Sequence, residues 1–170
     1  MLSEPSGLFR SPVMSIEPTW IDYNGHLNMA YYNVLFDRCI DAAFEGFGLG
    51  PDYIRARDAS FFTAEVHVCY LRELAETDKV VCELQFLDCD AKRAHVFQTL
   101  YHADEGWASA TQEQMSLHVD MRAKKVSPWP DDVMARMNAM REAHAGYDWP
   151  DRAGRRIGIQ RAVAEQTAKA

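Results

Sequence analysis

The sequence predicts an α+β fold, in which a curled antiparallel five-stranded sheet wraps around one long helix and an extra helix follows near the C-terminus. Two patterns indicate this fold: apolar residues recur at steps of three and four after residue 28, and four segments between residues 60 and 119 alternate with a period of two. The length of 170 residues fits one domain, which we place at residues 1–150. One helix cannot cover both faces of such a sheet, so we expect a second copy to bury the remainder.

The first strand and the long helix are predicted from the N-terminal third. A short mixed segment within residues 8–17 predicts the strand. Asn28 directly precedes the helical pattern, where its amide oxygen would cap free backbone N–H groups. Glycines and a proline after residue 45 favour the end of the helix, and we expect residues 48–59 to form a loop. The apolar stripe of the helix consists of Tyr32, Phe36, Ile40, Ala43, Phe44 and Phe47.

The remaining elements follow from alternation and from one more helical stripe. Short polar connections, such as Asp104-Glu105-Gly106, are typical of hairpins. The last 20 residues, 151–170, carry five basic and two acidic side chains and are expected to form a solvated, partly disordered tail. The alternative is that this tail binds an anion through Arg152, Arg155, Arg156 and Arg161. The predicted strands cover residues 60–70, 80–87, 93–102 and 107–119, and the second helix covers residues 131–144 with Val133, Met134, Met137 and Met140 as its stripe.

Composition and charge exclude several classes of protein. The net charge of -7 argues against nucleic acid as a partner. No apolar run approaches the roughly 18 residues of a membrane span. Residues 1–12 lack the pattern of a signal peptide, so we expect a cytoplasmic protein. The four cysteines and six histidines show no metal-ligand spacing, which predicts reduced cysteines and no metal site.

The most informative stretch is the turn that leads into the long helix. Asp22 and His26 flank Gly25 in this turn, and the helix begins a few residues later. The N-terminus of a helix carries unpaired N–H donors and partial positive charge, which suit a developing oxyanion. The turn therefore predicts a site that combines a carboxylate, an imidazole and an oxyanion-binding helix end.

The turn resembles a known family signature. Asp22-Tyr23-Asn24-Gly25-His26-Leu27-Asn28, followed by Tyr31, is similar to the D-x-x-G-H-x-N-x-x-Y motif of hotdog-fold acyl-CoA thioesterases of the 4-hydroxybenzoyl-CoA thioesterase-like type. This resemblance covers roughly residues 10–130 and implies a hotdog fold and hydrolysis of a small acyl-CoA thioester. It also implies a homodimer or a dimer of dimers, and no cofactor, since CoA enters as part of the substrate. The implied catalytic residues are Asp22, Gly25, His26, Leu27 and Asn28.

A narrower likeness concerns the substrate. Residues 20–30, 92–95, 110–113 and 117–120 are similar to the thioesterase associated with carnitine dehydrogenases. This likeness implies betainyl-CoA as the substrate, a place in carnitine metabolism, and association with a carnitine dehydrogenase. Betainyl-CoA carries a quaternary ammonium group, which aromatic rings attract by cation–π interaction.

Candidate binding residues follow from these chemical needs. The expected substrate-binding residues are the aromatic and polar side chains Trp20, Tyr23, Tyr31, Tyr32, Glu65, His67, Thr111 and Glu113. CoA carries phosphates, and an acidic protein must meet them with local basic groups. The expected CoA-binding residues are Arg93, Arg122, Lys124 and Lys125.

Several alternatives remain open from the sequence. Asp22 can act as the nucleophile or as a general base on water, and it can also merely shape the turn. His26 can equally hold the loop by hydrogen bonds, and Asn28 can serve as a helix cap. A hydratase or dehydratase would use the same architecture with a catalytic histidine and an acidic partner. A third alternative is a non-catalytic dimer that binds an acyl ligand.

Overall fold

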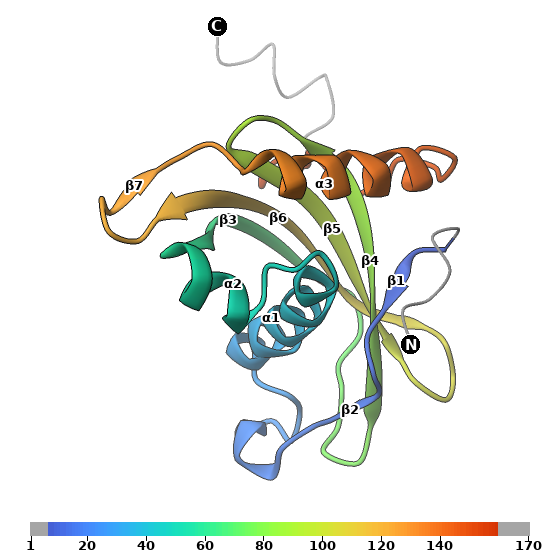
Figure 1. Cartoon of the computed structure of the whole chain (residues 1–170). Helices are drawn as coiled ribbons and strands as arrows, with labels where there is room; N and C mark the ends of the chain where they lie inside the picture. The colour runs from blue at the N-terminus through green and yellow to red at the C-terminus, as the bar shows by residue number, and fades with distance from the viewer. Residues whose placement is uncertain (1–6, 160–170) are drawn as a thin grey trace, which may run out of the picture.

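A curved antiparallel sheet encloses α1 (Met29–Gly46) on its concave face in the computed structural model, which describes residues 7–159 (Figure 1). The main strand order is β1-β4-β5-β6-β3, while β2 pairs with β4 and β7 pairs with β6. The four strands predicted from alternation are confirmed within two residues at each end. The strands are β1 (Phe9–Arg10), β2 (Met14–Ser15), β3 (Ala59–Tyr70), β4 (Lys79–Cys89), β5 (Arg93–His102), β6 (Ala108–Asp120) and β7 (Lys125–Val126).

The helix α1 forms the centre of the core. Its predicted stripe is buried, with Phe36, Ile40 and Phe44 at 0% exposure. The predicted cap is confirmed, since the Asn28 side-chain oxygen accepts a hydrogen bond from the Ala30 N–H at 3.0 Å. Burial of the apolar stripe against the sheet, rather than helix propensity, stabilises a helix of this length.

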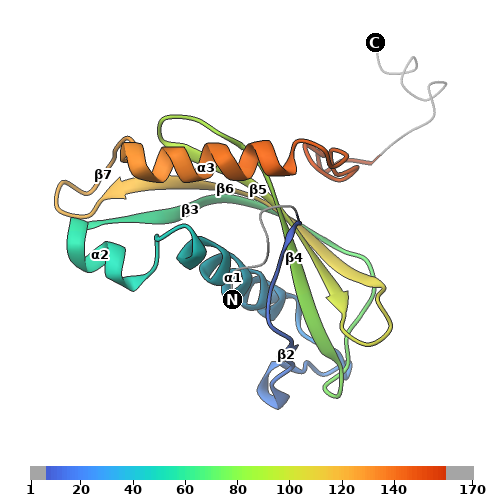
Figure 2. The ribbon, with the colours of Figure 1, turned by 45° about the vertical axis from the view of Figure 1, so that its right-hand side comes forward.

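The convex face of the sheet is partly covered by α3 (Asp131–His144), which lies on the side opposite α1 (Figure 2). Val133 and Met137 of α3 are fully buried, and the helix packs mainly on β4. At the bulge in β4, the Phe86 N–H donates a hydrogen bond of 2.8 Å to His144 Nδ1. The helix α3 therefore covers the β4 side of the convex face, whereas α1 fills the concave face.

Two local predictions need correction. The expected first strand is split into β1 and β2 by residues 11–13, and Pro12 among them has no N–H to donate to a sheet ladder. The expected loop at residues 48–59 contains the helix α2 (Pro51–Arg57). Pro51 stands at the first turn of this helix, where proline is tolerated because the N–H would be unpaired anyway. The same proline that favours the end of α1 in the sequence therefore begins a second helix.

The strand β3 forms one edge of the sheet. It pairs with β6 alone among residues 7–159, and a bulge between Thr63 and Glu65 interrupts that pairing. Phe62 and Val66 are 47% and 43% exposed on this strand. An exposed apolar edge strand is a template for pairing with another chain.

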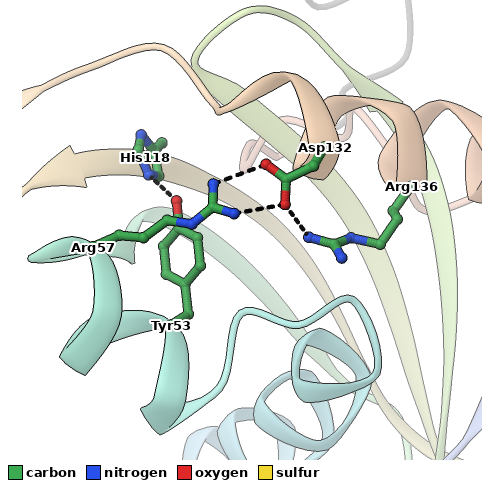
Figure 3. A network of polar contacts seen from close by, with 5 residues as sticks. All are labelled: Tyr53, Arg57, His118, Asp132 and Arg136. Carbon is green, nitrogen blue, oxygen red and sulfur yellow. Dashed lines mark hydrogen bonds and ion pairs between the residues drawn. The ribbon is translucent and has the colours of Figure 1, made fainter.

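A polar cluster joins α2, β6 and α3, and we call these five residues the clasp: Tyr53, Arg57, His118, Asp132 and Arg136 (Figure 3). Tyr53 and His118 form a buried hydrogen bond of 2.8 Å between Oη and Nε2. Arg57 donates to both carboxylate oxygens of Asp132 at 2.8 Å, and Arg136 donates to one of them at 2.9 Å. The clasp thus ties the short helix α2 to the sheet and to α3.

The chain after α3 returns across the convex face, and we call residues 148–157 the strap. Gln85 of β4 donates a hydrogen bond of 3.2 Å to the Asp148 carbonyl. The Gly154 N–H donates a hydrogen bond of 2.7 Å to Glu113 of β6. The first part of the predicted basic tail therefore contacts the sheet, while residues 160–170 lie outside the described residues.

None of the helices between residues 7 and 159 combines the length and the apolar character needed to cross a membrane.

Candidate active site

The turn at Asp22 is held by its backbone and leaves its carboxylate accessible. The Asp22 N–H donates to the His26 carbonyl at 2.9 Å, and Gly25 adopts a φ of +79°, which favours glycine. Asp22 Oδ1 accepts a hydrogen bond of 2.8 Å from the Asn24 N–H. Within residues 7–159, no group donates to Asp22 Oδ2. That oxygen is free to contact a substrate or a water molecule.

The ends of the turn are fixed against neighbouring segments. The Asn28 N–H donates to the Trp20 carbonyl at 2.9 Å, and the Leu27 N–H donates to the Leu74 carbonyl at 2.7 Å. The Leu27 N–H, which we expected near the oxyanion, is therefore already paired. The backbone N–H groups of His26 and Met29 form no hydrogen bond within the described part of the chain. These two groups are the donors available to an oxyanion at the N-terminus of α1.

The expected aromatic residues occupy different environments around this turn. Trp20 is buried and stacks on Tyr31 with ring centroids 5.3 Å apart. Tyr32 is also buried and contacts Tyr70 edge to face, and burial raises the pKa of the Tyr32 phenol. Tyr23 is 97% exposed at the tip of the turn. Trp20 and Tyr32 therefore build the support of the turn, whereas Tyr23 is left for contact with a ligand or a partner.

A polar cavity lies between α1 and the β6–β3 edge of the sheet. Gln112 of β6 donates to Asn33 of α1 at 3.1 Å and accepts from Gln98 of β5 at 3.1 Å. Buried glutamines at core-facing positions are unusual, because each needs hydrogen-bond partners. The sequence contains this signal, since Gln98 and Gln112 stand at core-facing positions of alternating segments, where apolar residues are expected. The cavity has a volume of about 310 Å³ and is lined by Asn33, Val34, Asp37, Thr63, Val66, Gln112 and Gln114.

This cavity is continuous with an acidic row on α1. Asn33 and Asp37 follow Met29 at intervals of four residues, so they extend from the helix N-terminus along neighbouring turns. Asp41 continues the row, and burial raises its pKa, with Asp37 and Glu45 adding negative charge nearby. Asp37, Asp41 and Glu45 also line a neighbouring cavity of about 650 Å³. The row favours a positively charged ligand beside the helix.

The other expected substrate-binding residues lie on the opposite face of the sheet. Glu113 and Thr111 alternate with Gln112, which faces α1, so their side chains point to the convex face. Glu65 and His67 pair with that part of β6. Glu113 Oε1 lies 2.8 Å from His95 Nε2, and Oε2 accepts from Gly154, so both of its oxygens are used. The structure therefore separates these polar residues from the aromatic residues at the turn.

The expected CoA-binding residues do not form one cluster either. Arg93 pairs with Asp90, and its guanidinium together with nearby backbone N–H groups lowers the pKa of Asp90 to about 2. Arg122 pairs with Asp58 at 2.6 Å. Lys124 is exposed at the end of the turn between β6 and β7, and Lys125 is exposed as the first residue of β7. Two of the four expected cations are thus already neutralised by a carboxylate.

No group of three or more His, Cys, Asp or Glu residues within 7–159 is arranged to hold a metal ion.

Comparison with known proteins gives a consistent result. The sequence profile of the thioesterase-like superfamily matches residues 16–137. The chain is 37% identical over 158 residues to a betainyl-CoA thioesterase from Pseudomonas aeruginosa, and the aligned region covers 93% of this chain and 98% of that protein. It is 38% identical over 158 residues to an L-carnitine dehydrogenase/betainyl-CoA thioesterase from Rhizobium meliloti, covering 93% of this chain but 32% of that protein. The chain spans about a third of the length of this second relative.

Solved structures with the same fold include thioesterases. A hypothetical protein from Staphylococcus aureus, determined in complex with CoA, is 26% identical, with a TM-score of 0.84 and coverage of 94% of this chain and 100% of that chain. A putative thioesterase from Pseudomonas putida is 30% identical, with a TM-score of 0.77 and coverage of 91% and 99%. The predicted hotdog fold, with its extra C-terminal helix, is confirmed.

Proposed function

Because the chain belongs to the thioesterase-like superfamily, we propose that it is an acyl-CoA thioesterase that hydrolyses betainyl-CoA to betaine and free CoA. The observation that carries the proposal is the 37% identity to a betainyl-CoA thioesterase over nearly the whole of both chains. The Asp22 turn supports it, since a free carboxylate oxygen lies in the same turn as two free N–H donors. Hydrolysis breaks the C–S bond, adds water to the acyl carbon and returns a proton to the thiolate.

The proposed mechanism assigns each role to a group at the turn. Asp22 either attacks the thioester carbonyl, which expels the CoA thiolate and leaves a mixed anhydride that water then hydrolyses to regenerate Asp22, or it activates a water molecule that attacks the carbonyl directly. The N–H groups of His26 and Met29 stabilise the oxyanion, and the partial positive charge of the α1 N-terminus adds to this effect. Gly25 gives the turn its backbone conformation, and Asn28 caps the helix that presents the donors. Thiolates leave readily, so the reaction needs no strong dedicated acid.

We propose that the cationic acyl group binds in the polar cavity beside α1, where the Asp37 carboxylate attracts its positive charge. Asp37 lies on the row that starts at Met29, and it lines both cavities on this side of the helix. Glu113, the carboxylate expected from the sequence, lies on the other face and is paired with His95 and Gly154. Asp37 is therefore better placed than Glu113 to attract a quaternary ammonium group.

The experiment measures thiol release from betainyl-CoA and from 3,3-dimethylbutyryl-CoA, in which carbon replaces the quaternary nitrogen. We expect the wild type to hydrolyse both substrates and to prefer betainyl-CoA. In Asp37→Asn we expect the ratio of kcat/KM for betainyl-CoA to that for the neutral analogue to fall by about fivefold to tenfold. Asp104→Asn, an exposed carboxylate in the β5–β6 turn, is the control for charge. Equal preference in wild type and Asp37→Asn contradicts the role of Asp37, and absence of thiol release from any acyl-CoA contradicts the function.

We also propose that the working form is a homodimer or a dimer of dimers, formed through the β3 edge. The exposed side chains of Phe62 and Val66 and the free edge of β3 support this assembly. The open Asp22 turn is then completed by a second copy. Light scattering that shows a monomer at assay concentration contradicts the assembly.

We also propose that this protein associates with a carnitine dehydrogenase. The name of the longer relative from Rhizobium meliloti combines that activity with betainyl-CoA thioesterase in one chain. Co-purification of a carnitine dehydrogenase with the native protein tests the association, and its absence from the purified complex counts against it.

A further inference from the structure

Two neighbouring arginines on the strap have no carboxylate partner. Arg155 and Arg156 are exposed, and neither forms an ion pair with any residue between 7 and 159. Arg72 and Arg152 also lack an ion pair with any residue between 7 and 159, but the Arg72 guanidinium stacks on the Trp107 ring at 4.0 Å, and Arg152 does not line the cavity described below. The arginines that do pair with carboxylates are Arg10, Arg38, Arg55, Arg57, Arg93, Arg122, Arg136 and Arg141. In an acidic protein, two adjacent unpaired arginines indicate a place for an external anion.

The strap that carries these arginines is fixed to the sheet immediately before them. The Gly154 N–H donates to Glu113 Oε2 at 2.7 Å, and Glu113 is held in turn by His95 at 2.8 Å. The Glu113 and His95 side chains are only 16% and 20% exposed. The Trp149 ring contacts the His95 ring with centroids 6.0 Å apart. Anchoring at Gly154 reduces the entropy that Arg155 and Arg156 would lose on binding a ligand.

A cavity of about 530 Å³ opens between the strap and the β3–β6 part of the convex face. Arg155 and Arg156 line it from the strap, and His67 and His95 line it from the sheet. Two carboxylates also border the cavity. Glu113 has both oxygens occupied by His95 and Gly154, and Glu65 is exposed at the β3 edge. The volume lies within the range of small-molecule sites.

The strap cavity and the cavity beside α1 meet at the β3–β6 edge, because Val66 and Gln114 line both. Resting on the proposed acyl-CoA thioesterase function, we propose that Arg155 and Arg156 bind phosphate groups of the CoA portion of the substrate, with His67 on the opposite wall. Guanidinium groups bind phosphate oxygens through paired N–H donors, which makes arginine well suited to this role. The chain up to residue 150 has a net charge of -10, because the tail carries +3 of the total of -7. A local pair of free cations offsets the repulsion between that charge and the phosphates.

This assignment of the phosphate-binding residues differs from the prediction made from the sequence, which named Arg93, Arg122, Lys124 and Lys125. Arg93 and Arg122 are each paired with a carboxylate, so binding a phosphate would first require breaking an ion pair. Lys124, just before β7, and Lys125, its first residue, form no ion pair with any residue between 7 and 159 and are the competing site. They stand on a turn where Lys124 has a φ of +53°.

The test measures binding of CoA, dephospho-CoA, pantetheine and inorganic phosphate to the full chain by calorimetry, which needs no turnover. We expect Arg155→Ala/Arg156→Ala to weaken CoA binding by about 10- to 100-fold and to leave pantetheine binding unchanged. Arg152→Ala is the matched control, because Arg152 lies on the same strap and does not line the cavity. Weaker binding of CoA but not of dephospho-CoA in the double variant assigns the 3′-phosphate, and weaker binding of both assigns the pyrophosphate.

Four results would overturn the proposal. They are unchanged CoA binding in the double variant, an equal loss in Arg152→Ala, a loss found only in Lys124→Ala/Lys125→Ala, and a site that binds inorganic phosphate as tightly as CoA. The phosphate-binding role of the strap and the thioesterase function can be refuted independently of each other. Thioester hydrolysis with strap-independent CoA binding removes the strap assignment and keeps the enzyme, whereas strap-dependent CoA binding without hydrolysis keeps the strap assignment and removes the enzyme.

Discussion

The Asp22 turn and the clasp are both polar regions beside a helix N-terminus, yet they differ in how their charges are used. At the clasp, both oxygens of Asp132 accept hydrogen bonds from arginines, and the ring of His118 contacts Tyr53 (Figure 3). The other ring nitrogen of His118 lies 3.1 Å from the Ser127 carbonyl oxygen. At the turn, Asp22 has one bonded oxygen and one free oxygen. Polar groups that are fully paired stabilise a structure, whereas unpaired ones remain available to a ligand.

The arginines also divide into those paired with a carboxylate and those without such a partner among residues 7–159. Arg57 and Arg136 are held by Asp132 and connect α2 to α3. Arg155 and Arg156 have no such partner and face a cavity. We infer that the protein places paired charges where elements must be joined and unpaired charges where substrate must bind.

The largest effect is expected at Asp22. Asp22→Asn keeps an oxygen that can accept from the Asn24 N–H, so the turn is preserved, but it removes the negative charge that attacks or activates water. We expect kcat to fall by about 10²- to 10⁴-fold with an unchanged melting temperature. Steady-state thiol release and thermal unfolding measure the two quantities. Activity near the wild-type level would show that the carboxylate only shapes the turn.

A smaller effect, on stability alone, is expected at the clasp. Tyr53→Phe removes the buried hydrogen bond of 2.8 Å to His118 and leaves a ring nitrogen without a partner. We expect the unfolding free energy to fall by about 1–3 kcal/mol. Urea unfolding measures this loss. A loss of turnover without a loss of stability would place the clasp in the catalytic machinery instead.

The smallest effect concerns the pH dependence of stability. Burial lowers the pKa of His118 below its ordinary value of 6.5, and burial lowers the pKa of His144 as well. The unfolded chain therefore binds a proton at these residues before the folded chain does, so the unfolding free energy falls as the pH drops below about 6.5. In His118→Asn we expect a weaker fall between about pH 7 and pH 5.5. An unchanged slope would mean that His118 does not titrate in this range.

The sequence predicted the order of elements well, because alternation and helical spacing are local signals. It missed α2, since Pro51 stops one helix and starts another, and the same residue is compatible with both interpretations. It found Asp22 and the helix cap because these lie close together in the chain. It could not place Glu113 or Arg93, because an ion pair and a face of the sheet depend on residues far away in the sequence. The unpaired state of Arg155 is likewise visible only in three dimensions.

The most direct test compares Asp22→Asn with Tyr53→Phe by measuring kcat for thiol release and the melting temperature of both variants side by side. If unpaired charge serves catalysis and paired polar groups serve stability, Asp22→Asn loses turnover and keeps its melting temperature, while Tyr53→Phe does the reverse. An Asp22→Asn protein that unfolds at a lower temperature and still releases thiol at the wild-type rate would contradict the account.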